Sequence, residues 1–299
     1  MAPPVPGRSP RLSDRGLAVA FISPAMLLLL TMSVFPLLLS LFLSFTDYSA
    51  TRNVPAEFVG FQNYIDVLTS SEVHQRALTT LVYVVGAVTL QTVLGFGIAY
   101  LISRRTHGRG LLTTLFLVPM MLSPVVVGLF WRFMLDTQFG VINSMLGSLG
   151  FGQVEWLTQQ RTAMLSLIVV DTWQWTPFIM LIALAGLTAV PKYLYEAASI
   201  DRASEWFRFR HITLPMVWPL LLIAVMFRAI EAFRLFDLVY ILTNGGPGVS
   251  TETLSFHVYK VAFLGFNTGL ASAYGILMVL VVIVLAQIYL RYLNKLKEG

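Results

Sequence analysis

Charged side chains recur every three residues within one otherwise apolar stretch of the sequence. They are Arg228, Glu231, Arg234 and Asp237. Charged groups are costly inside a membrane, so they usually face the interior of a helix bundle or a water-filled cavity. Each step of three residues turns the direction by about 60°, which places Arg228 and Asp237 on opposite sides of a helix. Arg228 and Glu231 are therefore candidates for contact with a solute, and interhelical ion pairing is the alternative.

A second polar face comes earlier in the chain. Asp171, Gln174, Trp175 and Phe178 follow the i, i+3, i+4, i+7 spacing that places side chains on one side of a helix. Aromatic rings stack on the apolar faces of sugars, while amides and carboxylates hydrogen-bond hydroxyl groups. Pro177 removes one backbone donor, which favours a kink in this helix. The face suits a pathway for a hydroxyl-rich solute, and packing or interfacial anchoring is the alternative for the aromatic residues.

The motifs of common catalytic and metal sites are missing from the sequence. There is no cysteine, which excludes thiolate catalysis and a Cys-based zinc site. The sequence contains neither an HExxH pair nor a GxSxG elbow. Lys192, Lys260, Lys295 and Lys297 all lack a preceding glycine, so no Walker A loop can cradle a nucleotide. We expect no catalytic residue, metal or cofactor on this chain, and any ATP hydrolysis, with its Mg²⁺, on a partner subunit.

The elements that carry these residues must be membrane-spanning helices. The 299 residues are 57% hydrophobic and 12% charged, whereas soluble domains are about 45–50% apolar and about 25% charged. A span needs about 20 mostly apolar residues. Six stretches qualify: 17–45, 77–102, 111–135, 163–190, 214–241 and 268–292. We expect an all-α polytopic membrane protein with a disordered tail at 1–16 and a single transmembrane domain at 17–299.

Arginine and lysine residues are distributed unequally between alternate loops. Thirteen lie in one set of segments and four in the other. The larger set is Arg8, Arg11, Arg15, Arg104, Arg105, Arg109, Lys192, Arg202, Arg208, Arg210, Arg291, Lys295 and Lys297; the smaller is Arg52, Arg76, Arg161 and Lys260. Because basic residues stay on the cytoplasmic side, we expect both termini in the cytoplasm.

A cytoplasmic loop at 191–213 joins the fourth and fifth stretches. Pro191 can occupy the first turn of a helix, and Leu194, Ala197 and Ala198 then share one face. The two alanines leave a smooth surface that suits docking against another protein. An amphipathic helix lying on the membrane surface is the alternative.

This loop resembles the "EAA" loop of binding-protein-dependent ABC importer permeases, whose pattern is E-A-A-x-x-D-G-A and, after a spacer, I-x-L-P. The matching residues are Glu196, Ala197, Ala198, Asp201, Ala203, Ile212, Leu214 and Pro215. The resemblance implies that Glu196, Ala197, Ala198, Asp201 and Ala203 form a coupling helix seated in a groove of an ATPase subunit. Arg202 departs from the pattern, because the family usually has glycine there and a non-glycine residue at positive φ is strained.

Further motifs resemble the carbohydrate branch of the family, the maltose and glycerol-phosphate type. They lie at Phe58–Tyr64, Trp173–Phe178, Ala185–Leu187, Phe233–Asp237, Leu242–Pro247 and Thr251–Thr253. The resemblance implies a type I importer permease in a bacterial inner membrane. Its solute would be a sugar, polyol, sugar phosphate or other sugar derivative. Its partners would be a second homologous permease, two ATPase subunits, an external binding protein and membrane lipid, without nucleic acid.

Two other functions compete with this interpretation. An ion-coupled secondary transporter could use Asp171, Glu231 and Asp237 as a proton relay, without an ATPase. That function leaves the coupling loop unexplained, and six spans are few for such a carrier. A membrane scaffold without transport leaves the charges within the spans without a purpose.

Overall fold

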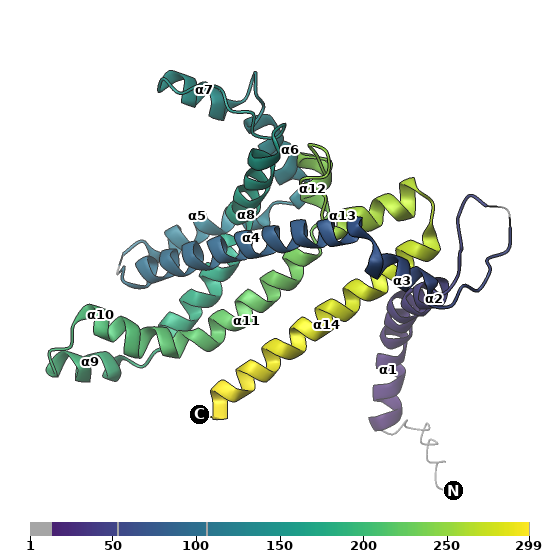
Figure 1. Ribbon diagram of the computed structural model, residues 1–299. Helices are drawn as coiled ribbons and strands as arrows, with labels where there is room; N and C mark the ends of the chain where they lie inside the picture. The colour runs from purple at the N-terminus through teal and green to yellow at the C-terminus, as the bar shows by residue number, and fades with distance from the viewer. Residues whose placement is uncertain (1–13, 53, 106, 299) are drawn as a thin grey trace, which may run out of the picture.

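The structure is a computed structural model of the chain, and it describes residues 14–52, 54–105 and 107–298. Across these residues the chain forms helices and one isolated bridge between Thr46 and Phe58, and it forms no strand (Figure 1). The predicted all-α polytopic fold is confirmed. Residues 1–13 of the predicted tail lie outside the described part.

Five helical runs in the described residues are long and apolar enough to cross a membrane: Arg15–Leu43, Ser71–Ser103, Gln160–Ala189, Glu205–Phe233 and Thr268–Lys295. The first run contains α1 (Asp14–Leu29), a π-helical turn and α2 (Phe35–Leu43). The second, third and fifth are α4 (Ser71–Ser103), α8 (Gln160–Ala189) and most of α14 (Thr268–Glu298). The fourth contains α10 (Glu205–Arg208), a π-helical turn (Phe209–Thr213) and α11 (Leu214–Phe233). Pro177 lies inside α8, which continues through it as one helix.

The third predicted stretch, 111–135, is broken rather than straight. It consists of α5 (Arg109–Met121) and α6 (Pro124–Met134), whose axes differ by 92°. Proline disfavours helical geometry in the residue before it, and Ser123 is accordingly extended, with φ −61° and ψ 139°. Pro124 then opens the first turn of α6. The stretch predicted as one span therefore consists of two helices, because Pro124 can begin a helix but cannot continue the previous one.

The fifth predicted stretch, 214–241, is also divided. The helix α11 ends at Phe233, and a separate short helix, α12 (Asp237–Leu242), packs against α6. Asp237 is therefore on a different helix from Arg228, and the expected rotation along one helix does not apply to it.

The centre of the domain is the parallel pair α4 and α8, in which Gly86 faces Ile168 and Gly95 faces Ile179, with α11 packed on both. The backbones approach closely at Gly95, where an added Cβ would lie 2.8 Å from the Ile179 Cβ. Small residues at such positions allow tight helix packing in membranes. Two buried apolar clusters result, one around Tyr83 and Leu167 and the other around Ile179.

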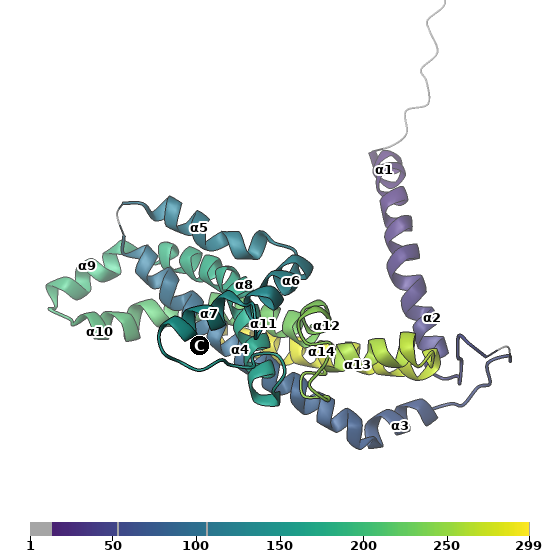
Figure 2. The same ribbon diagram turned by 90° about the horizontal axis from the view of Figure 1, so that it is seen from above.

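The first helices stand apart from this centre (Figure 2). Side chains of the apolar run from α1 through α2 are not buried within the chain, and α2 packs mainly on α14. The ends of that contact are joined by backbone hydrogen bonds, including Gly269 N to Tyr48 O at 2.8 Å. A Cβ at Gly269 would collide with the Thr46 carbonyl, so glycine is required for this approach.

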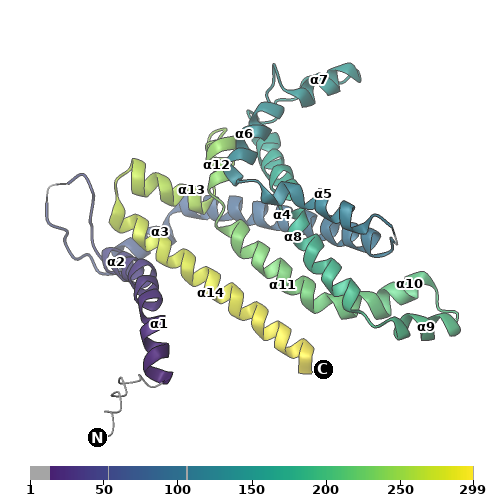
Figure 3. The same ribbon diagram turned by 180° about the vertical axis from the view of Figure 1, so that it is seen from behind.

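The shorter helices lie at the two ends of the bundle. They are α3 (Gln62–Thr69), α7 (Val141–Ser148), α9 (Lys192–Ile200) and α13 (Leu254–Tyr259). Seen from behind, α9 and α10 lie at one end, beyond α11, while α7 and α13 lie towards the other (Figure 3).

Candidate functional site

A cavity of about 130 Å³ lies where α8, α11 and α12 meet. Its wall includes Asp171, Gln174, Trp175, Arg228 and Glu231. We call it the mid-span cavity. Two separate sequence patterns, one on each of two spans, therefore meet at one place in the structure.

Phe178 does not line the mid-span cavity. One helical turn beyond Trp175, its side chain packs instead on the buried cluster around Ile179. Only the first three residues of the expected face on α8 line the mid-span cavity.

A buried polar network closes the inner side of the mid-span cavity. The Arg228 Nη2 donates to Asp171 Oδ2 at 2.9 Å, and the Arg228 Nε donates to Gln91 Oε1 at 2.8 Å. The Gln91 Nε2 in turn donates to Asp171 Oδ2 at 2.7 Å. The side chains of Arg228 and Asp171 are 3% and 2% exposed. Because each charge has its counter-charge and amide partner, this network joins α4, α8 and α11 as an interhelical lock.

The ring of Trp175 links this polar network to the mid-span cavity. The Arg228 Cζ lies 4.8 Å from the ring centroid of Trp175, which is a cation–π distance. Trp175 remains partly exposed. The ring of Trp175 therefore contacts the Arg228 guanidinium and keeps part of its surface available for contact with a ligand.

The outer rim of the mid-span cavity carries unpaired charges. Glu231, Arg234 and Asp237 are exposed, and in the described part of the chain none of them forms an ion pair. Gln174 is different, because it is 1% exposed and its Nε2 donates to the Leu122 carbonyl at 3.1 Å. The amide of Gln174 thus supports the break between α5 and α6, while Trp175 and Glu231 remain available to a hydroxyl-bearing solute.

Sequence reasoning missed Gln91, the residue that completes the network. The signal was present, because Gln91 is the one amide side chain in the apolar stretch 77–102. A lone amide in such a stretch must find a polar partner, since hydrocarbon offers none.

The predicted coupling loop forms a compact projection that follows the C-terminal end of α8. It contains α9, a turn at Arg202, α10 and the π-helical turn before α11. The Tyr195 hydroxyl lies 2.8 Å from the Thr213 Oγ1, which ties the start of the projection to its end.

The face expected for docking is divided in the structure. Ala198 is 9% exposed and Leu194 packs on the chain's own core, whereas Ala197 is exposed. The expectation that all three share an outer face is wrong, because the helix turns two of them towards the spans. The outer apolar residues on α9 are instead Tyr193, Ala197 and Ile200, with Glu196 also exposed.

The turn after α9 has the conformation that glycine favours, although an arginine occupies it. Arg202 adopts φ +53°, in the left-handed region. The Ala203 N donates to Ala198 O at 2.8 Å and the Arg202 N donates to Ser199 O at 3.1 Å. These two bonds are those of a Schellman cap, whose left-handed residue is usually glycine. The chain therefore makes the turn that glycine favours at the energetic cost of a Cβ.

An ionic cluster holds the loop between α12 and α13 on the α7 side of the bundle. Glu252 is 1% exposed and accepts hydrogen bonds from Arg76 Nε, His257 Nδ1 and Lys260 Nζ at 3.2, 2.7 and 2.8 Å. Burial raises the pKa of Glu252, but the bonds from His257, Lys260 and Arg76 outweigh it and lower the pKa to about 2. The carboxylate thus stays charged in mild acid.

This cluster predicts a specific loss of stability in acid. A carboxyl group with a lowered folded-state pKa stabilises the fold above its ordinary pKa, and this stabilisation disappears as the pH falls towards the folded-state value. Glu252→Gln should lower the unfolding free energy at pH 7 by about 2 kcal/mol and flatten the fall between pH 4.5 and pH 2. Thermal unfolding across this range would measure both effects. Exposed Glu57→Gln is the control, and an equal pH profile in the two variants would contradict the assignment.

No group of three or more His, Asp or Glu residues within the described ranges could hold a metal ion.

Comparison with known proteins identifies the family. Residues 91–298 match the model of "binding-protein-dependent transport system inner membrane component". A probable ABC transporter permease protein, y4oQ, from Sinorhizobium fredii is 42% identical over 85% of this chain and 82% of that protein. The trehalose/maltose transport system permease protein MalF from Thermococcus litoralis is 38% identical over 78% of this chain and 79% of its own length.

A third relative and one solved structure extend over nearly the whole chain. The sulfoquinovosyl glycerol transport system permease protein SmoG from Agrobacterium fabrum is 33% identical over 95% of this chain and 92% of that protein. The crystal structure of a bacterial alginate ABC transporter in complex with alginate pentasaccharide-bound periplasmic protein has a chain of the same fold. Its TM-score is 0.80 at 22% identity, covering 91% of this chain and 92% of that one. The chain therefore belongs to the inner-membrane components of binding-protein-dependent transport systems, and it is a multi-pass ABC importer permease rather than an enzyme.

Proposed function

We propose that this permease forms half of the translocation pathway for a carbohydrate or related solute, received from an external binding protein. The curated names of its relatives include trehalose/maltose, sulfoquinovosyl glycerol and trehalose permeases. The observation that carries the proposal to this chain is the mid-span cavity, whose wall includes both the partly exposed Trp175 ring and the Glu231 carboxylate, which has no ion pair among the described residues. Stacking and hydroxyl hydrogen bonding are available together there. The solute is a sugar, polyol, sugar phosphate or other sugar derivative that offers both an apolar face and hydroxyl groups.

The remaining subunits follow from this proposal. A second homologous permease would supply the other half of the pathway, and two ATPase subunits would bind and hydrolyse ATP with Mg²⁺. The coupling loop on each permease would contact one ATPase through the outer surface of α9. A proton-relay mechanism is less suitable, because Asp171 already accepts hydrogen bonds from Arg228 and Gln91.

Uptake by the reconstituted transporter would test the pathway. Trp175→Ala and Glu231→Gln should each reduce uptake of labelled trehalose or maltose about tenfold, since each removes one of the two contacts available to solute. The matched control is Trp218→Ala on α11, whose indole is 39% exposed and lies outside the cavity. ATPase association should be unchanged in all three variants. Normal uptake by both cavity variants would place the pathway elsewhere.

We also propose that the coupling loop and both termini are cytoplasmic. In Figure 1 the start of α1, α9 with α10, and the end of α14 all lie towards the lower side, while α7 lies at the upper end. A reporter that is active only outside the membrane should therefore work when fused near Ser148 or Gly248. It should be inactive near Gly108 or after α14. Activity at the latter fusion would reverse the proposed orientation.

A further inference from the structure

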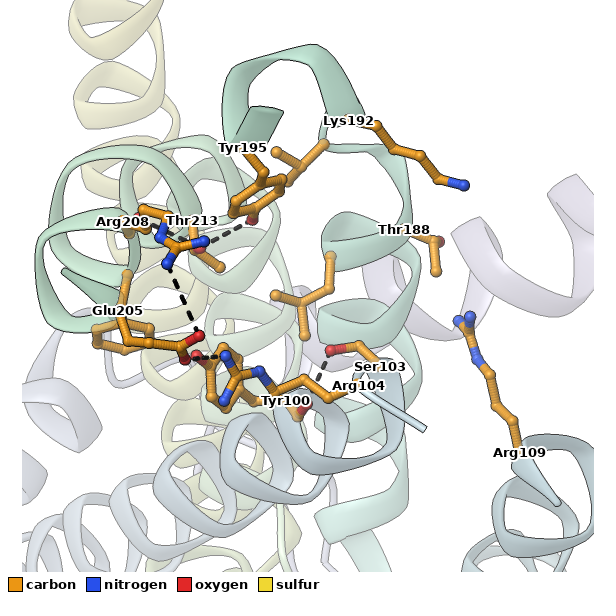
Figure 4. A pocket seen from close by; sticks show the side chains of 13 residues that line it. Tyr100, Ser103, Arg104, Arg109, Thr188, Lys192, Tyr195, Glu205, Arg208 and Thr213 are labelled. Atoms are coloured by element: carbon orange, nitrogen blue, oxygen red, sulfur yellow. Dashed lines mark hydrogen bonds and ion pairs between the residues drawn. The ribbon is translucent and has the colours of Figure 1, made fainter. Parts of the chain in front are cut away.

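A second and larger cavity, of about 530 Å³, lies where the coupling loop meets the ends of the spans. Figure 4 shows its side chains, which come from the end of α4, the start of α5, the end of α8 and the loop itself. Its charged residues are Arg104, Arg109, Lys192, Arg208 and Glu205. Four cationic groups thus surround a single carboxylate, and we call this space the basic cavity.

The carboxylate of Glu205 is shared by two of the four cations. Arg104 Nη2 forms a hydrogen-bonded ion pair with Glu205 Oε2, and Arg208 Nη2 lies 4.0 Å from Glu205 Oε1. The Arg104 guanidinium also lies over the Tyr100 ring, 5.1 Å from its centroid. These contacts hold the end of α4 against α10 and leave Glu205 no capacity to neutralise the other cations.

The other two cations form the open half of the basic cavity. Arg109 and Lys192 have no carboxylate within ion-pair distance in the described chain. Their charged ends lie on either side of Thr188 in Figure 4. In addition, the Nε of Arg208 is buried and has no hydrogen-bond partner within the described part of the chain. Buried donors almost always have a partner, so the cavity combines surplus positive charge with an unsatisfied donor.

We propose that the basic cavity binds a phosphate-bearing anion. A phosphate group offers several acceptor oxygens, which match the forked donors of arginine and the point charge of lysine. The volume lies within the range of small-molecule sites, about 300–1,000 Å³. An anionic lipid headgroup and a soluble phosphate ester share this chemistry.

Binding would act on the coupling loop through Glu205. An anion bound by Arg104 and Arg208 competes with the Glu205 carboxylate for the same guanidinium groups. The anion therefore replaces the direct contact between α4 and α10 with one that also includes Arg109 and Lys192. This arrangement makes the position of the coupling loop sensitive to a ligand distinct from the transported solute.

Binding to the full chain in phosphatidylcholine nanodiscs tests the proposal with two probes. Inorganic phosphate is titrated, and in a separate arm phosphatidylglycerol is added to the nanodiscs. Hydrogen exchange over residues 191–213 reports the response of the loop. Saturable protection by phosphate identifies a soluble source, and protection that requires phosphatidylglycerol identifies a lipid. Either result supports the site, and no protection in either arm overturns it.

Variants separate a specific site from general attraction. Arg109→Gln with Lys192→Gln should weaken binding at least about tenfold, since it removes two charged donors. The control Arg105→Gln with Arg210→Gln removes two exposed cations that do not line the cavity. Equal weakening in both pairs would overturn the proposal. Glu205→Gln removes the competing carboxylate and should strengthen binding, a gain that misfolding cannot produce; unchanged or weaker binding would contradict the competition.

Discussion

Replacing Arg228 with methionine is expected to destabilise the folded chain by about 3–5 kcal/mol, because it leaves the Asp171 carboxylate buried without its counter-charge. Asp171→Leu should destabilise the fold by a similar amount, because it leaves the Arg228 guanidinium buried without its counter-charge. Each side chain is almost fully enclosed in the lock between α8 and α11. Because so little of either side chain is exposed, solvent compensates poorly for the missing partner.

The double variant distinguishes this account from a simple loss of contacts. Replacing both members of a buried ion pair with apolar residues is often neutral, so Asp171→Leu with Arg228→Met should recover most of the lost stability. Unfolding of the purified chain in detergent would measure all three variants. Arg234→Met is the matched control, because Arg234 is exposed at the rim and should change stability little. If the double variant lost as much unfolding free energy as the two single variants combined, the ion pair would not be the stabilising unit.

Ala197→Trp is expected to abolish ATP-driven uptake while the permease still inserts and folds. Ala197 is exposed in the middle of α9, between the exposed side chains of Tyr193 and Ile200. An indole at this position would therefore keep an ATPase surface from contacting those two side chains. Glu196→Lys should act through charge, since breaking a charge pair at a packed interface costs about 2–5 kcal/mol. Ala198 is unsuitable for this test, because it is buried within the chain and a bulky residue would distort the loop itself.

Co-purification and ATPase assays on the complex would measure the coupling. Both variants should lose the ATPase subunit or its stimulation by solute, with an unchanged melting temperature for the permease. Ala56→Trp provides the control, because Ala56 is also exposed but lies in the loop between α2 and α3. Normal uptake in both α9 variants would show that this surface is not the docking face.

The sequence identified the membrane-spanning elements well because their signal is local. Twenty apolar residues reveal a span wherever its partners are, and Pro124 carries enough information to mark the break before α6. The polar contacts were harder to predict. Gln91, Asp171 and Arg228 lie on three separate helices, and only helix packing determines that Arg228 contacts Asp171 rather than Glu231, one turn away. The sequence likewise could not determine which side of α9 faces outwards, because small alanines fit both a buried and an exposed position.

The position of α1 has a consequence for biosynthesis. The span from α1 through α2 is synthesised before the helices described after it and has little packing surface on them, and α2 rests mainly on α14. The hydrogen bond between the backbones of Tyr48 and Gly269 therefore forms only after the 220 residues between them have been made. Until then the first span must remain in the bilayer as an independent apolar helix. The entropy lost on closing a loop grows only slowly with the length of the loop. The late contact between Tyr48 and Gly269 therefore costs little more free energy than a contact closing a shorter loop.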